Sequence, residues 1–227
     1  TGGLNIKGAD GMRQMKKDMG GGAHALGLAR LIMAMRLPVR LQMLVPAVEN
    51  SIAGNAYRPG EIVATRKGLA IEIGNTDAEG RVVLSDALTL AAESKPEMII
   101  DFATLTGAAR VALGPELPAT FANDDALFDA LNQASAATRD PLWRMPLWQN
   151  YNDMIKSRIG DIVNTGGPQA GAVTAALFLE HFVPSEQKWI HIDLFAWTPK
   201  PSPGRPEGGE AQTLRATFAM LEKKYAG

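Results

Sequence analysis

The sequence is 227 residues long and 46% hydrophobic, which predicts one large domain or at most two small ones and excludes a disordered chain. Its 23 basic and 24 acidic residues give a net charge of −1, which argues against a nucleic-acid binder with a broad basic face. Cysteine and runs of about 18 apolar residues are both absent, which excludes disulfides, cysteine-ligated metals, thiol catalysis and a membrane-spanning helix.

Hydrophobic periodicity predicts alternating helices and strands. Apolar residues at helical spacing predict a helix over 20–36, which Pro38 ends. The elements expected after it are strand 39–45, loop 49–61, strand 69–73, loop 75–81, helix 82–94, strand 97–103, helices 124–138 and 173–183, strand 189–196 and helix 211–226, with surface loops at 139–148 and 198–209. This order predicts an α/β domain of three layers, with a central, mostly parallel sheet flanked by helices.

The segment Asn75-Thr76-Asp77-Ala78-Glu79-Gly80-Arg81 follows a predicted strand, where open α/β sheets place their sites. In an extended segment, Asp77 and Glu79 would point the same way and repel each other unless a cation lies between them. A divalent metal is the usual solution, and Arg81 would face the same side and hold an anion. The alternative is a solvated polar loop that caps the next helix.

A second acidic position lies before a glycine run. Asp18 precedes Gly20, the start of a predicted helix, where a carboxylate either caps the helix or binds a metal. Lys7, Lys16 and Lys17 are nearby, and a lysine beside a metal site can act as an electrophile. The glycine run matches no phosphate-binding motif, so we attribute it to close helix packing.

The remaining polar residues give weaker signals. His24, His181 and His191 form neither an HxxxH nor an HExxH pattern, so each is expected to be a core or surface residue. No G-x-S-x-G motif is present, which argues against serine hydrolase chemistry.

NTDAEGR followed by VVLSDAL resembles the signature of the leucyl aminopeptidases of the cytosolic, M17-type family. The resemblance covers essentially the whole chain. Further segments that resemble the same catalytic domain, in the same order, are GGLNIK (2–7), MKKDMGGG (15–22), ENSIAGNAYRPGE (49–61), DFATLTGAARVALG (101–114), NTGGPQAGAVTAALFLEHFV (164–183) and WIHIDLFA (189–196).

The resemblance implies a two-metal exopeptidase that removes the N-terminal residue of a peptide with a metal-bridging water. Asp18 matches a ligand of one metal, Asp77 a ligand of the other, and Glu79 a carboxylate that bridges both. Lys7 matches the lysine that polarises the scissile carbonyl, and Arg81 the arginine that holds a bicarbonate acting as general base. The residues that match the lining of the substrate cleft are Met15, Asn75, Ala78, Thr104, Leu105 and Gly107. Mn²⁺ or Zn²⁺ is expected, with Mg²⁺ or Co²⁺ as alternatives.

Two departures from the family pattern affect these expectations. The chain begins with Thr1 rather than Met, and the family places a segment like GKGxTFD before this point, with a lysine ligand and a bridging aspartate. We therefore expect residues 1–227 to be a catalytic domain without that segment or the family's separate N-terminal domain, and to bind metal weakly when alone. Phe195 stands where the family has a small residue, which predicts a shorter pocket for the substrate's first side chain.

The expected partners are peptides and further copies of the chain, since family members form hexamers with the catalytic domains at the centre. A cytoplasmic location is expected. The alternative is a non-catalytic fragment, or a structural component of a DNA-associated oligomer, as some relatives are; the net charge gives that role no support.

Overall fold

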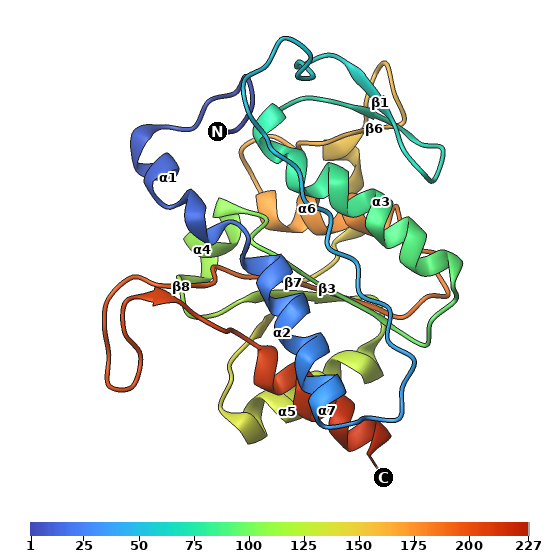
Figure 1. Ribbon diagram of the computed structural model, residues 1–227. Helices are drawn as coiled ribbons and strands as arrows, with labels where there is room; N and C mark the ends of the chain where they lie inside the picture. Colours follow the sequence, from blue (N-terminus) through green and yellow to red (C-terminus); the bar gives the residue numbers. More distant parts are fainter. Residues whose placement is uncertain (227) are drawn as a thin grey trace.

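The computed structural model describes residues 1–226 and has a four-stranded sheet at its centre, with strand order β3-β7-β4-β5. The β3–β7 and β4–β5 pairings are parallel and the β4–β7 pairing is antiparallel, so the expected mostly parallel sheet is confirmed. Helices cover both faces of the sheet, which confirms the three layers (Figure 1).

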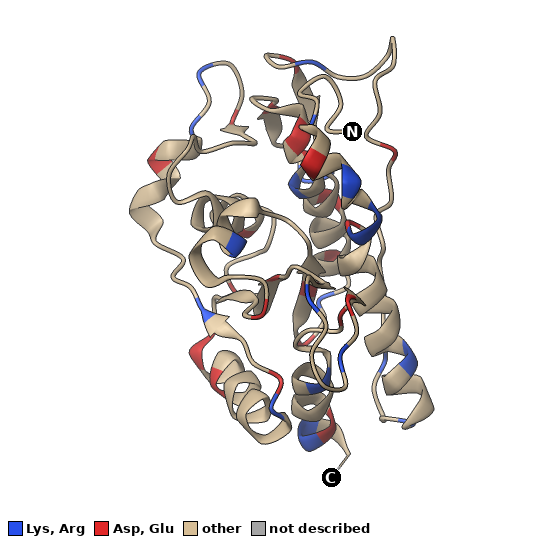
Figure 2. Cartoon of the chain, turned by 90° about the vertical axis from the view of Figure 1, so that its left-hand side faces the viewer, with Lys and Arg blue, Asp and Glu red and all other residues tan. Residues whose placement is uncertain are grey.

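The helices and strands, with η for 3-10 helices, are α1 (Ala9–Arg13), η1 (Met15–Lys17), α2 (Gly20–Ala34), β1 (Ile62–Ala64), β2 (Ala70–Glu72), η2 (Thr76–Ala78), α3 (Glu79–Glu93), β3 (Ile99–Ala103), α4 (Gly107–Leu113), β4 (Ala119–Ala122), α5 (Asp125–Thr138), β5 (Trp143–Arg144), η3 (Gln149–Ile155), β6 (Ile162–Val163), α6 (Gly171–Glu180), β7 (Trp189–Asp193), β8 (Trp197–Thr198), β9 (Gly208–Gly209) and α7 (Leu214–Tyr225). Figure 2 shows acidic and basic residues interspersed over these elements. No helix within residues 1–226 has both the length and the hydrophobicity needed to cross a bilayer.

Strand β7 shows how the sheet separates two apolar cores. Every residue of β7 is buried. Trp189 packs in the core that includes α3, α4 and α6, whereas Ile190 and Ile192 pack in the core that includes α2, α5 and α7. Successive side chains of a strand point to opposite faces, so a continuous apolar strand is buried on both sides.

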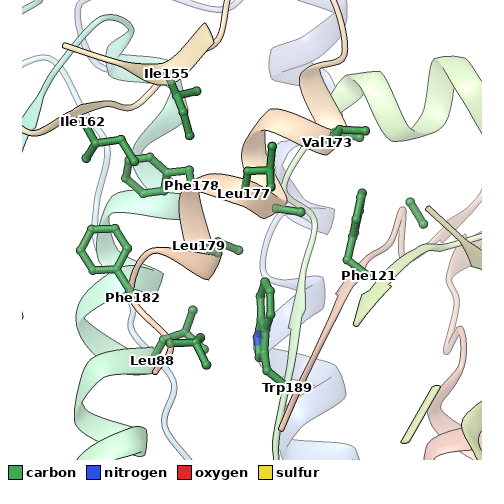
Figure 3. Close-up of a cluster of buried hydrophobic side chains, with 14 of the residues drawn as sticks. Leu88, Phe121, Ile155, Ile162, Val173, Leu177, Phe178, Leu179, Phe182 and Trp189 are labelled. Carbon is green, nitrogen blue, oxygen red and sulfur yellow. The ribbon is translucent and has the colours of Figure 1, made fainter. Parts of the chain in front are cut away.

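The first core is centred on α6. Residues 172–179 of this helix are all buried, which explains why its sequence is apolar all round rather than on one stripe. Figure 3 shows Phe178 and Leu177 of α6 in one apolar cluster with Leu88 of α3 and Trp189 of β7. This packing fixes α3, which carries Glu79 and Arg81, against the sheet.

One predicted strand is absent. Residues 39–45 form no strand, and Arg40, Leu41 and Met43 are exposed. The segment lies instead along the end of α3, where the Ser94 hydroxyl donates to Gln42 Oε1 at 2.9 Å. Alternation predicts a strand only where one face of the segment is buried, and here no neighbouring strand supplies that burial.

Candidate active site

The predicted site residues come from segments that meet where β3 and β7 end. Thr104 follows β3 and donates from its hydroxyl to Asp18 Oδ1 at 2.9 Å, which joins the end of the sheet to the turn before α2. Leu105 packs against Gly80, in the first turn of α3. Lys7 Nζ forms an ion pair with Asp77 Oδ1. The carboxyl ends of strands are where open α/β sheets hold their ligands.

Asp77 and Glu79 do not lie in an extended segment, so the expectation that alternation places them on one side is wrong. Asn75 is extended, with φ −147° and ψ 123°, and its side chain accepts a hydrogen bond from the Asp77 amide at 2.8 Å. This cap starts η2, which continues directly into α3 at Glu79, three residues earlier than predicted. In an α-helix, residues two apart point about 200° away from each other, so Glu79 and Arg81 face different surroundings.

The backbone of this turn is held by Asn164, to which the sequence assigned no role. Asn164 is 0% exposed, and its Oδ1 accepts from the amides of Gly74 at 2.8 Å and Asn75 at 3.1 Å. Its Nδ2 donates to the carbonyls of Asn75 at 2.8 Å and Ala78 at 3.3 Å. A buried asparagine with both ends satisfied fixes the turn in one conformation.

Glu79 is a partly buried acid of the site with an unsatisfied side-chain oxygen. Its Oε2 is buried and has no hydrogen-bond partner. Burial raises the pKa of Glu79, and the nearby carboxylates of Asp77 and Asp18 raise it further, while Lys7 opposes them. Burial, then Glu79 and Asp77, also raise the pKa of the Tyr57 hydroxyl to about 12. The surroundings of Glu79 therefore disfavour its charged form.

Arg81 is a buried residue of α3, two residues after Glu79. It is 8% exposed, and its Nε has no hydrogen-bond partner. Burial lowers the pKa of Arg81 to about 10, and the carboxylates of Asp193 and Glu79 limit the decrease. A buried guanidinium with a free N–H is suited to hold a small anion in a fixed orientation.

The site contains carboxylates of the kind that bind metal ions, but they are not grouped closely around one point. Within residues 1–226, no three His, Asp or Glu side chains are grouped closely enough to form a ready-made metal site. The carboxylates of Asp77 and Asp18 nevertheless raise the pKa of Glu79, and Glu79 Oε2 has no protein partner. Carboxylate oxygens are the donors that hard divalent cations take, so these residues fit such a cation, with Lys7 competing for Asp77.

The sequence matches decide the family. Residues 1–218 match the catalytic domain of the cytosol aminopeptidase family, peptidase family M17. The chain belongs to this family. Probable cytosol aminopeptidases of Roseiflexus castenholzii and Geobacter sulfurreducens are 49% and 46% identical, over 97% and 98% of this chain and 46% and 45% of their own. The chain therefore spans about half the length of these curated relatives.

Several solved structures have the same fold as this chain. The cytosol aminopeptidase from Coxiella burnetii is 60% identical, with a TM-score of 0.96 over 99% of this chain and 49% of its own. A bottromycin maturation enzyme in complex with Mn is 34% identical, with a TM-score of 0.93 over 98% of this chain and 50% of its own. A mutant of tomato leucine aminopeptidase is 39% identical, with a TM-score of 0.83 over 92% and 41%.

In this M17 domain, Asp193 organises the loop between β3 and α4, another role that the sequence did not reveal. Its Oδ1 accepts from the amides of Leu105 at 2.9 Å and Thr106 at 3.1 Å, and its Oδ2 accepts from the Thr106 hydroxyl at 2.6 Å. Burial raises the pKa of Asp193 although these hydrogen bonds oppose the shift. The sequence feature that could have predicted this role is an acid at the end of a buried strand, in the segment WIHIDL.

Two further residues that the sequence predicts for the substrate cleft lie in short helices. Met15 lies half-buried in η1, and Gly107 is the exposed first residue of α4. The three histidines are bonded elsewhere: His24 to Gly20 and Gln212, His181 to Asn152, and His191 to Asp101.

Proposed function

We propose that residues 1–227 are the catalytic domain of a metal-dependent aminopeptidase that removes the N-terminal residue of peptides. The observation that carries the proposal is the Lys7–Asp77 ion pair beside the buried, unpartnered oxygen of Glu79, in a chain that belongs to the M17 family. A paired lysine and acids with unsatisfied oxygens, at the end of a sheet, are the parts that metal-assisted hydrolysis uses.

Asp18, Asp77 and Glu79 would hold two divalent cations, for which Mn²⁺ is supported by the Mn complex of the bottromycin enzyme, with Zn²⁺, Mg²⁺ and Co²⁺ as alternatives. Such ions supply Lewis-acid polarisation of the scissile carbonyl and lower the pKa of a water molecule. To bind them, the three carboxylates would have to come closer to one another, and the ion pair between Lys7 and Asp77 would have to break.

Once released, Lys7 Nζ would donate a hydrogen bond to the oxygen on which negative charge develops during attack at the scissile carbonyl. Arg81 would hold a bicarbonate ion, a source of a general base, because its Nε lacks a protein partner. Met15, Asn75, Ala78, Thr104, Leu105 and Gly107 would line the cleft and orient the peptide.

The assembly and location also belong to this proposal. We expect homo-oligomers, hexamers by resemblance to the family, with peptides as substrates and the cytoplasm as the location. The name of the relatives supports the location. Interspersed charges favour no nucleic-acid surface (Figure 2).

The test is hydrolysis of leucine p-nitroanilide after removal of metals with EDTA and addition of Mn²⁺, Zn²⁺, Mg²⁺ or Co²⁺ one at a time. We expect activity that returns with metal and is absent with N-acetyl-leucine p-nitroanilide, because an aminopeptidase needs a free amino group. Inactivity of the intact parent protein with every ion would refute the function, and full activity of a Glu79→Ala variant would refute the assignment of Glu79. Anomalous scattering near Asp18, Asp77 and Glu79 would count the ions.

A further inference from the structure

Two cations flank the ring of Phe195 at the edge of the candidate site. Lys17 Nζ lies 5.1 Å from the ring centroid, and Arg110 Cζ lies 4.7 Å from it. Lys17 precedes Asp18 in the chain, whereas Arg110 is in α4, where its Nη2 lies close to Gly107. Two segments far apart in the sequence thus each contribute one positive charge, and both charges contact the same aromatic ring.

The charge of this pair is not balanced by the protein. Among the described residues, neither Lys17 nor Arg110 forms an ion pair or a side-chain hydrogen bond, although Lys17 is only 6% exposed. Burial, followed by repulsion from Arg110, lowers the pKa of Lys17. An ammonium group on a largely buried side chain that has no protein partner can pair with an anionic group of a ligand.

The nearby acids are engaged elsewhere. Asp18 and Asp193 are the carboxylates that raise the pKa of Lys17, but both oxygens of Asp193 accept hydrogen bonds from the loop that follows β3. Asp18 accepts from the Thr104 hydroxyl and is a proposed metal ligand. The site therefore retains positive charge beside the position of the substrate's first side chain.

We propose that Lys17 and Arg110 bind the side-chain carboxylate of an N-terminal glutamate or aspartate, so that the enzyme prefers peptides that begin with an acidic residue. The inference rests on the proposed aminopeptidase function and names its substrate class. The Phe195 ring closes the apolar part of the pocket, and the flanking cations supply the specificity.

The experiment compares kcat/KM for the p-nitroanilides of glutamate and glutamine, using the Mn²⁺-loaded protein. The two side chains have the same shape and differ in charge, and an anilide has no main-chain carboxylate that could bind instead. We expect glutamate to be preferred by about tenfold or more, since hydrogen bonds between charged groups have that value. Lys17→Met and Arg110→Gln should each lower the Glu/Gln ratio about tenfold, whereas Arg30→Gln, at an exposed position of α2, should not.

A charge reversal and a binding measurement complete the test. Arg110→Glu should shift the preference toward lysine p-nitroanilide. Calorimetry with free L-glutamate and L-glutamine makes the same comparison without turnover, so tighter glutamate binding without any hydrolysis would support the inference and refute only the proposed function. Equal or better use of glutamine, or a Glu/Gln ratio that neither variant changes, would overturn the inference and leave an aminopeptidase of other specificity.

Discussion

Lys7 and Asp77 form an ion pair that joins the start of the chain to the turn before α3. Hydrogen bonds between side chains and backbone also tie this turn to the start of the chain, because the Asn5 side chain accepts from the Thr76 amide at 2.7 Å. The Thr76 hydroxyl donates to the Gly2 carbonyl at 2.6 Å. These hydrogen bonds and the ion pair therefore hold the proposed electrophile and the proposed metal ligand in contact, and a cation that binds Asp77 would have to compete with Lys7.

Replacing Lys7 tests this competition. Lys7→Met removes a positive charge from Asp77, so we expect divalent cations to bind more tightly while kcat falls about hundredfold, as for the loss of an oxyanion donor. Calorimetric Mn²⁺ titration and steady-state kinetics measure the two effects. Lys156→Met is the control, because Lys156 also pairs with an aspartate, Asp153, but on the exposed surface. Weaker Mn²⁺ binding by Lys7→Met would contradict the competition.

Glu79 makes the stability of the metal-free protein depend on pH. Its folded pKa is raised, chiefly by burial, so the unfolded chain gives up the proton first and stability falls as pH rises from the unfolded pKa through the folded one. Glu79→Gln removes this penalty. We expect the metal-free variant to melt at a higher temperature than the parent at pH 8, with a difference that disappears near pH 4.

Saturating Mn²⁺ should reverse that order, because a cation stabilises the parent carboxylate and has less to bind in the variant. Differential scanning calorimetry with and without EDTA measures both comparisons. If the metal-free parent instead melts at a higher temperature than Glu79→Gln at pH 8, burial does not penalise this carboxylate.

Asp193 is expected to position the loop that carries Leu105 and Thr106. Asp193→Asn places an amide where both side-chain oxygens now accept hydrogen bonds, so at least one donor loses its acceptor, at a cost of about 1–3 kcal/mol in unfolding free energy. KM should rise more than kcat falls, because the loop would orient the substrate. Urea denaturation and kinetics measure these effects, with exposed Asp129→Asn as control. A change in stability alone would assign Asp193 to the scaffold only.

Two glycines of α2 give opposite predictions for the same substitution. A Cβ on Gly21 would overlap the backbone carbonyl of Phe102 in β3, which cannot yield as a side chain does. Gly21→Ala should therefore cost about 1–3 kcal/mol and displace Asp18 from Thr104. A Cβ on Gly27 would meet only the methyl groups of Leu214, at 3.6 and 3.7 Å. Gly27→Ala should stabilise the protein by about 0.5–1 kcal/mol, because alanine favours a helix. Thermal melts that rank the two variants otherwise would contradict this packing of α2 against β3.

Much of the fold can be predicted from the sequence, because a buried face makes apolar residues recur at helical or strand spacing. The helix expected over 20–36 is α2, and the apolar runs expected as strands at 97–103 and 189–196 contain β3 and β7, which pair in parallel in the four-stranded sheet. Short elements such as α4 and β4 have too few residues to establish a period. The segment 39–45 alternates without forming a strand, because no other strand reaches it.

The sequence by itself determined the family and the residues available for chemistry, since motifs such as NTDAEGR identify residue types in a fixed order. Only the tertiary structure decided how they meet. Asn164, 85 or more residues from the turn it fixes, and Asp193, equally far from the loop it holds, act through hydrogen bonds between distant segments. Periodicity reports only on neighbours along the chain, whereas burial and charge at a site depend on all the segments that fold around it.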